Sequence, residues 1–421
     1  EQVALNDRLF LTAAVRTDQN SAFGTNFQRV FYPKGAISWV MSDESFFPKM
    51  SWLSQFRLRG AVGSSGVQPG PNDALRTFGV VSTNIASAEV AGLRSAALGN
   101  LDLKPERSQE IEAGFDSRLF SERVNFEFTY YRKTSQDALI NQVIAPSAGS
   151  SSATVLKNLG SVRNWGYEAL ITAQLLNRRN IAWDVTFNGS HNSNELVTLG
   201  NDAQGKPIPP IIGTTIQQRP GYPLNGYWQR PYTYADANND GIIVPSEITV
   251  ADSAIFRGYS QPRLEVSVIN GIDLFNRRLR IQGLVDHKSG FKVLNSEQQF
   301  LCQQAVSCLE TSTLNPPLYR QARAVAQRFK TPVTTLDGYI EDNSFIRFRE
   351  LSATFTLPDR WARTFARAKG ATIVGAARNL AVWTDWTGVD PEQNYSQGDT
   401  QATLLTAGPP KYITFRVNLR Y

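Results

Sequence analysis

Apolar and polar residues alternate strictly along several stretches of this chain. In the C-terminal stretch KYITFRVNLRY, one face carries Ile413, Phe415, Val417, Leu419 and Tyr421, and the residues between them are polar or charged. Successive side chains of a β-strand point to opposite faces, so the alternation predicts a strand with one apolar and one polar face. The stretches RVNFEFTYY, GYEALITAQL and NIAWDVTFN repeat the pattern. We therefore predict an all-β chain.

The alternation predicts about twelve strands of this kind. They lie near residues 8–16, 35–41, 55–63, 106–116, 123–133, 162–175, 180–191, 263–274, 278–286, 345–357, 371–383 and 412–421. Between Phe348 and Leu351 the apolar positions change parity, which predicts a β-bulge. After that strand, Asp359 is expected to cap a short helix that Gly370 stops, and this helix would close one hairpin.

The predicted strands are joined by short turns at one end and by long segments at the other. Polar turns lie within FDSRLFSERVNFEF, AQLLNRRNIAWDV and IDLFNRRLRIQG, whereas the segments 64–105, 194–261, 289–343 and 385–410 are long. Outer-membrane barrels have this asymmetry, with short periplasmic turns and long extracellular loops. No stretch reaches the about eighteen apolar residues of a transmembrane helix. The predicted fold is a transmembrane antiparallel β-barrel.

A soluble β-sandwich is the alternative, because its strands alternate as well and its apolar face packs against a second sheet. Aromatic residues near the predicted strand ends favour the barrel, where they would form two girdles at the membrane surfaces. They are Trp39, Tyr130, Tyr131, Trp165, Trp183, Trp383 and Tyr421. The two folds differ in what surrounds the side chains of Phe126, Trp183, Val266 and Phe415. These side chains face lipid in a barrel and a second sheet in a sandwich.

Charge and histidine content argue against two classes of function. Lys+Arg 43 exceed Asp+Glu 37, but the basic residues are scattered singly, so we expect no nucleic-acid partner. The two histidines, His191 and His287, fall on different predicted strands, and no nucleophile elbow, paired-histidine motif or phosphate loop accompanies them. We therefore predict no catalytic residues and no enzyme activity.

The stretch DANNDGIIVPSE has the ligand spacing of a calcium loop. The predicted ligands are the side chains of Asp236, Asn238 and Asp240, the carbonyl of Ile242 and the Glu247 carboxylate. The alternative is a metal-free turn in which Asn and Asp side chains bind the backbone. Aromatic and β-branched residues flank the loop in place of helices, so any Ca²⁺ would be structural and not a signal.

Two further features lie in the long segments. Cys302 and Cys308 are expected to form a disulfide in an oxidising compartment, which requires any helix there to break between them; two free thiols are the alternative. The aromatic stretch NGYWQRPYTY suggests substrate contacts by Tyr227, Trp228 and Tyr232.

Several stretches together resemble the SusC/RagA-type, TonB-dependent transporters of the bacterial outer membrane. They are RLFLTAAVRTDQNSAFGTNFQRVFYPKGAISWVMSDESFF, NLDLKPERSQEIEAGFDSRLF, NLGSVRNWGYEALI, RGYSQPRLEVSV, FIRFRELSATFTLP and ARNLAVWTDWTGVDPE. The resemblance covers nearly the whole chain. It implies that residues 1–421 are the C-terminal part of a barrel of about twenty-two strands. The plug domain and TonB-interacting segment of the family would precede Glu1, outside this chain.

The resemblance also implies function and partners. The complete protein would import oligosaccharides or oligopeptides across the outer membrane, with energy from the TonB complex acting through the plug. A SusD-like surface lipoprotein would cover the long-loop face, outer-membrane lipid and lipopolysaccharide would surround the barrel, and Tyr421 would be read by the barrel-assembly machinery or serve only as a girdle aromatic. The alternatives are a SusC-like barrel that acts only as an envelope scaffold, and a secreted calcium-dependent carbohydrate-binding β-protein.

Overall fold

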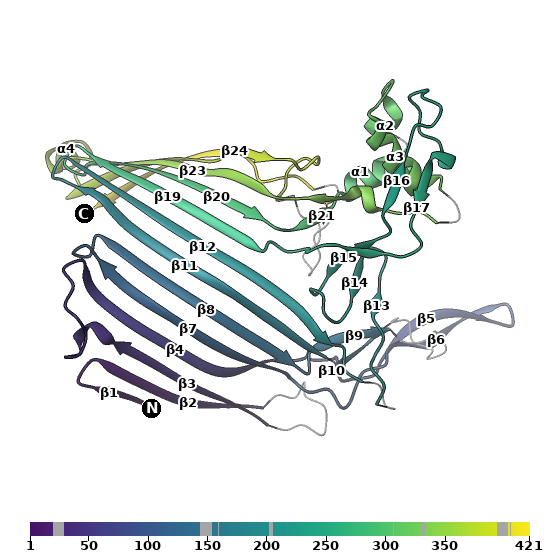
Figure 1. Ribbon diagram of the computed structural model, residues 1–421, viewed down its shortest axis with the longest axis horizontal. Helices are drawn as coiled ribbons and strands as arrows, with labels where there is room; N and C mark the ends of the chain where they lie inside the picture. The colour runs from purple at the N-terminus through teal and green to yellow at the C-terminus, as the bar shows by residue number, and fades with distance from the viewer. Residues whose placement is uncertain are drawn as a thin grey trace.

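A large antiparallel sheet dominates the computed structural model of this chain (Figure 1), which describes residues 1–19, 29–143, 154–158, 160–201, 205–305, 307–330, 333–393, 403–404 and 406–421. Thirteen strands form the sheet in the order β1-β2-β3-β4-β7-β8-β11-β12-β19-β20-β23-β24-β25. Their bounds are β1 Gln2–Leu5, β2 Leu9–Asp18, β3 Val30–Val40, β4 Leu53–Val67, β7 Glu106–Leu119, β8 Val124–Gln136, β11 Ser161–Asn177, β12 Ile181–Thr198, β19 Leu264–Leu274, β20 Leu279–Ser289, β23 Phe345–Thr356, β24 Gly370–Thr384 and β25 Tyr412–Arg420.

Each strand of this sheet pairs with its neighbours along the chain, as in an up-and-down barrel. All twelve predicted strands are present, and β1 is an addition that the sequence analysis missed. Within the described ranges, no strand pairs with the outer edge of β1 or of β25, so the sheet is part of a barrel wall. The predicted all-β barrel fold is confirmed.

The two faces of the sheet differ sharply in chemistry. On one face, aromatic side chains contact one another across strands, for example Phe115 and Phe126 with ring centroids 5.2 Å apart. On the other face, charged side chains pair across strands, as Arg280 does with Asp184 at 2.8 Å. Trp183 is 39% and Phe415 81% exposed, and among the described residues no second sheet covers the apolar face. The sandwich alternative therefore fails.

The predicted bulge lies in β23. Its pairing with β24 shifts register between Phe348 and Glu350, and its pairing with β20 shifts between Leu284 and Val285 on the partner strand. The extra residue accounts for the change of apolar parity.

The predicted helix, α4 (Asp359–Ala366), closes the turn between β23 and β24, but its ends were assigned wrongly. Pro358 is the N-cap, and Asp359 is the first helical residue without a side-chain capping bond. Proline suits this position because a helix start leaves its first N–H groups unpaired. Arg367 ends the helix in the left-handed conformation (φ 50°), so no glycine is needed, and Gly370 begins β24.

The long connections fold into small elements at one end of the sheet, opposite α4 (Figure 1). The strands are β5 Thr77–Ile85, β6 Ala88–Ala97, β9 Leu139–Val143, β10 Thr154–Asn158, β13 Ile211–Ile212, β14 Ile216–Gln218, β15 Gly226–Gln229, β16 Tyr232–Tyr234, β17 Ile248–Val250, β18 Ile255–Gly258, β21 Lys292–Leu294 and β22 Ile340–Asp342. The helices are α1 Ser296–Phe300, the π-helix η4 Leu301–Ala305, α2 Leu309–Ser312 and α3 Leu318–Arg328, with 3₁₀ turns η3 Pro245–Glu247 and η5 Asp337–Tyr339. A further 3₁₀ turn, η1 Met41–Asp43, lies between β3 and β4 at the other end of the sheet (Figure 1). Among the described residues, no helix is long and apolar enough to cross a lipid bilayer.

Candidate functional site

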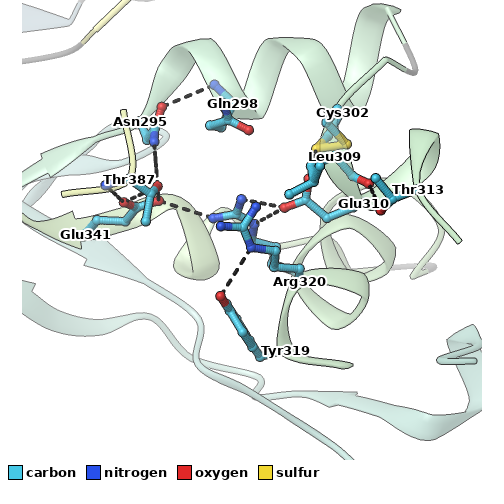
Figure 2. A network of polar contacts seen from close by, with 12 residues as sticks. Asn295, Gln298, Cys302, Leu309, Glu310, Thr313, Tyr319, Arg320, Glu341 and Thr387 are labelled. Atoms are coloured by element: carbon cyan, nitrogen blue, oxygen red, sulfur yellow. Dashed lines mark hydrogen bonds and ion pairs between the residues drawn. A yellow bond between two sulfur atoms is a disulfide. The ribbon is translucent and has the colours of Figure 1, made fainter. Parts of the chain in front are cut away.

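The described elements of residues 205–262 and 290–343 form what we call the loop assembly. Its centre is a buried group of charges, in which Arg323 of α3 binds the Glu310 carboxylate through Nε at 2.7 Å and the Glu341 carboxylate through Nη1 at 3.1 Å. Figure 2 labels the two carboxylates. The side chains of Arg323 and Glu310 are 5% and 0% exposed. Arg323 also lies over the Tyr339 ring, 4.9 Å from its centroid. These contacts join α2, α3 and β22, which are far apart in sequence.

A disulfide joins Cys302 and Cys308 beside this group (Figure 2). The π-helix η4 ends at Ala305, and Cys308 is the extended N-cap residue of α2, so the helix breaks between the two cysteines. Their Cα atoms are 4.8 Å apart, which is within the usual range for a disulfide. The bond pins α2, and with it Glu310, to the beginning of η4.

The predicted calcium loop is an exposed turn with many internal hydrogen bonds. Asp236 accepts the backbone N–H of Gly241 at 2.9 Å, and Glu247 accepts those of Ala237 at 2.8 Å and Val244 at 3.1 Å. Asn238 donates to Asp240 at 2.8 Å. These bonds draw the predicted ligands around one turn and leave further lone pairs on each carboxylate.

Calcium binding by this loop stays a prediction. Among the described residues, the one group of three acidic, histidine or cysteine side chains close enough to share an ion is Cys302, Cys308 and Glu310, and its two cysteines are bonded to each other. The loop is held firmly by α3, because Gln321 accepts the N–H of Ile243 at 2.9 Å and donates to the carbonyl of Gly241 at 2.9 Å. Ile243 itself packs in the core with Ala322 and Ala326.

The three aromatic residues suggested as substrate contacts are structural in this arrangement. Tyr227 is 1% and Trp228 5% exposed, while Tyr232 is half-buried against α3. Burial raises the pKa of Tyr227 to about 12, so its hydroxyl stays protonated while it accepts the N–H of Leu294 at 3.2 Å. Their contact with a substrate stays a prediction, and the buried rings of Tyr227 and Trp228 offer it no surface here.

The segment after β24, residues 385–393, is clamped onto the polar face of the sheet. Arg347 of β23 binds Asp390 at 2.6 Å and Glu392 at 2.8 Å, and Arg349 binds Glu392 at 2.7 Å. Burial acts to raise the pKa of Glu392, but the hydrogen bond and charge of Arg349, with the charge of Arg347, outweigh it and hold that pKa below its usual value. Asn343 completes the clamp by donating to the carbonyl of Pro391 at 2.7 Å.

A cavity of about 550 Å³ opens between the polar face of the sheet and the strands β13 and β14. Lys133 and Asn164 are cross-strand partners on β8 and β11 and therefore share this face. The loop side contributes Gln218 and Asn225, where Asn225 is in the left-handed conformation (φ 57°) that turns the chain from β14 into β15. The turn is fixed to β12, because the Asn194 side chain accepts the N–H of Leu224 at 2.7 Å. This cavity is the candidate binding site.

Neither histidine lies in the cavity. His191 is on β12, 3.4 Å from Arg263, and His287 on β20 contacts the carbonyl of Phe345 at 2.8 Å. The sequence analysis did not single out the cavity residues, because they lie on elements separated by up to 119 positions, from Glu106 to Asn225. The polar lining residues of β8 and β11, namely Lys133, Ser135 and Asn164, share the inward parity of their strands, and the apolar lining residues share no such signal.

This chain is similar to known proteins. The family described as "TonB dependent receptor-like, beta-barrel" matches residues 1–271. TonB-dependent receptor P3 of Formosa agariphila is 26% identical over 95% of this chain and 42% of its own length. TonB-dependent receptor SusC of Bacteroides thetaiotaomicron is 25% identical over 99% of this chain and 42% of its own length. The chain thus spans less than half the length of these curated relatives.

Solved structures show the same fold. The structure of the RagAB peptide importer in the "closed-closed" state superposes with a TM-score of 0.79 at 21% identity, covering 98% of this chain and 46% of that chain. At this identity the likeness concerns the fold alone. It agrees with the sheet described above as one part of a larger barrel wall.

Proposed function

Because this chain belongs to the family of TonB-dependent receptor-like β-barrels, we propose that it forms part of the wall and the outer loops of an importer in the bacterial outer membrane. The family is one of outer-membrane proteins, which fixes the location. The complete protein would take up oligosaccharides or oligopeptides, driven by the TonB complex.

One structural observation carries this proposal: the sheet is apolar and uncovered on one face and charged on the other, with its long loops at one end. In lipid every backbone polar group needs an internal partner, and paired strands supply it. The apolar face then contacts lipid, and the polar face lines a water-filled lumen. Loops at one end of that lumen are placed to select what enters it.

The names of the similar proteins support the proposal that the importer works with partner proteins. SusC is called a TonB-dependent receptor, and RagAB is described as a peptide importer. By this likeness, a SusD-like surface lipoprotein would cover the loop end. Oligopeptides and oligosaccharides both remain within the proposal at this level.

Uptake by cells tests the proposal. Cells that produce the complete receptor, with or without a functional TonB, are given fluorescently labelled peptides from a casein digest and labelled maltoheptaose. We expect accumulation of at least one probe that requires TonB and stops when the proton gradient is collapsed. Equal uptake with and without TonB would contradict import. An intact envelope assembly with no uptake of either probe would instead favour the scaffold role.

A further inference from the structure

We infer that the cavity between β8, β11 and β14 binds an extended oligopeptide in preference to a glycan. This inference rests on the proposed importer and names the substrate class for one part of it. The cavity of about 550 Å³ holds several residues of a peptide and lies where the loop assembly meets the polar face.

The cavity is lined by charges of both signs. Lys133 and Glu106 both line it, both are half-buried, and in the part of the chain that the structure describes neither has an ion-pair partner. Some other charges of the polar face are paired, as Lys288 is with Glu265 at 2.9 Å. Glu110 lies opposite Lys133 in the β7–β8 register and, among the described residues, makes no ion pair with it. A half-buried charge is stabilised by an opposite charge, so a ligand carrying both signs fits this site. Peptides carry both, at their termini and side chains, whereas neutral glycans carry neither.

Side-chain amide groups also line the cavity. Asn225 donates its backbone N–H to the Gln218 side chain at 3.0 Å, and the Gln218 side chain donates to that of Asn225. This pairing fixes both amide planes, and the side-chain N–H donors of Asn225 have no acceptor among the described residues. Asn164 faces them across the cavity and makes no side-chain hydrogen bond to a described residue. Fixed amides offer a donor and an acceptor side by side, which matches the alternating N–H and C=O of a peptide backbone.

Part of the cavity lining is apolar. Leu139, Val162 and Leu224 form it, next to a packed cluster that includes Leu196 and Leu199. These apolar lining residues provide a surface on which an apolar side chain of a peptide can pack. A pyranose ring instead presents flat C–H faces that aromatic rings cover, and none of the described lining residues is aromatic. The strand β13, whose Ile211 also lines the cavity, is the last of its small sheet, so an extended chain could pair along its edge.

The complete receptor in detergent tests the site directly. It is incubated with a casein digest, the retained peptides are identified by mass spectrometry, and one is resynthesised with a fluorophore for titration. Maltoheptaose serves as the glycan probe. The variants are Lys133→Gln, Glu106→Gln and Asn164→Ala, and the matched control is Lys369→Gln, an exposed lysine at the opposite end of the sheet.

We expect retained peptides whose Kd rises about tenfold in each cavity variant and stays unchanged in Lys369→Gln, with heat-modifiable gel migration of every variant showing that the barrel is intact. Peptides bound equally well by all variants would overturn the site. Maltoheptaose binding that the cavity variants weaken, with no peptide retained, would overturn the substrate class. Neither result would touch the proposed import, which is measured separately as TonB-dependent uptake in cells.

Discussion

Arg323 is the residue on which the loop assembly depends most. It neutralises Glu310, whose side chain is fully buried, and it also holds Glu341. Replacing it by methionine leaves an unpaired buried carboxylate, which costs about 3–5 kcal/mol in comparable sites. For Arg323→Met we therefore predict faster amide hydrogen exchange throughout α2, α3 and β22.

Arg320, one turn earlier on α3, is the matched control. It contacts the Tyr319 hydroxyl at 3.2 Å and is only half-buried, so Arg320→Met should leave exchange in α2 and β22 unchanged. Equal protection in the Arg323→Met and Arg320→Met proteins would show that the buried charges do not hold the assembly together.

The predicted calcium ligands form a second test at the residue scale. If Asp236, Asp240 and Glu247 bind Ca²⁺, an ion at a hundred times its Kd stabilises the folded state by about 2.7 kcal/mol. We predict slower hydrogen exchange in residues 236–247 and in α3 when 1 mM Ca²⁺ replaces EDTA, about the concentration that fills weak extracellular sites. Asp240→Asn combined with Glu247→Gln should abolish the difference. Identical exchange in Ca²⁺ and EDTA would leave the loop as a metal-free turn.

At the scale of elements, the clamp of residues 385–393 on β23 makes a prediction about pH. The pKa of Glu392 is lowered in the folded state, so its contribution to stability is present above the unfolded-state pKa of about 4.3 and is lost as pH falls through the lowered value. We expect the protection of residues 385–393 against hydrogen exchange, corrected for intrinsic rates, to be equal at pH 7 and pH 5 and to fall below pH 4.

The Glu392→Gln variant is the control for this clamp. It should be less protected at pH 7 and change less on acidification, while the ion pair of Arg347 with Asp390 is retained. A clamp that opens in the wild-type protein between pH 7 and pH 5 would contradict the assigned ion pairs.

The strands of the barrel wall could be predicted because each must alternate to separate lipid from water. The same rule located the bulge near Phe348. Strand β1 has four residues, which are too few for the alternation to be recognised in the sequence. Helix α3 was not predicted, although Leu318, Ala322, Val325 and Ala326 have the spacing of an apolar helix face. The prediction used the two-residue alternation of strands, which a helix does not show.

At the scale of the whole molecule, the loops show where sequence patterns stop being informative. Glu310, Arg323 and Glu341 come together from three elements, and the cavity collects residues from the barrel wall and from β14. Such contacts depend on tertiary placement, which no local period encodes. The cysteine pair was an exception, because a short separation in one segment limits its partners.

The asymmetry of the molecule connects these scales. The end with short turns and α4 carries little beyond connections, whereas the opposite end carries the disulfide, the buried charges, the clamp and the cavity. A rigid wall in lipid and a structured set of loops above a polar lumen are the division of roles that an importer requires.

The account depends most on the direction in which the two faces of the sheet point. Nitroxide labels on single introduced cysteines along β11 and β20, in the complete receptor reconstituted into bilayers, measure this by collision with lipid-soluble oxygen and with a water-soluble nickel chelate. We predict that labels at Ile171 and Val285 respond to oxygen and labels at Thr172 and Asp286 to nickel. If protein covers the apolar positions, labels there will collide with neither reagent. That result would contradict a membrane-spanning wall.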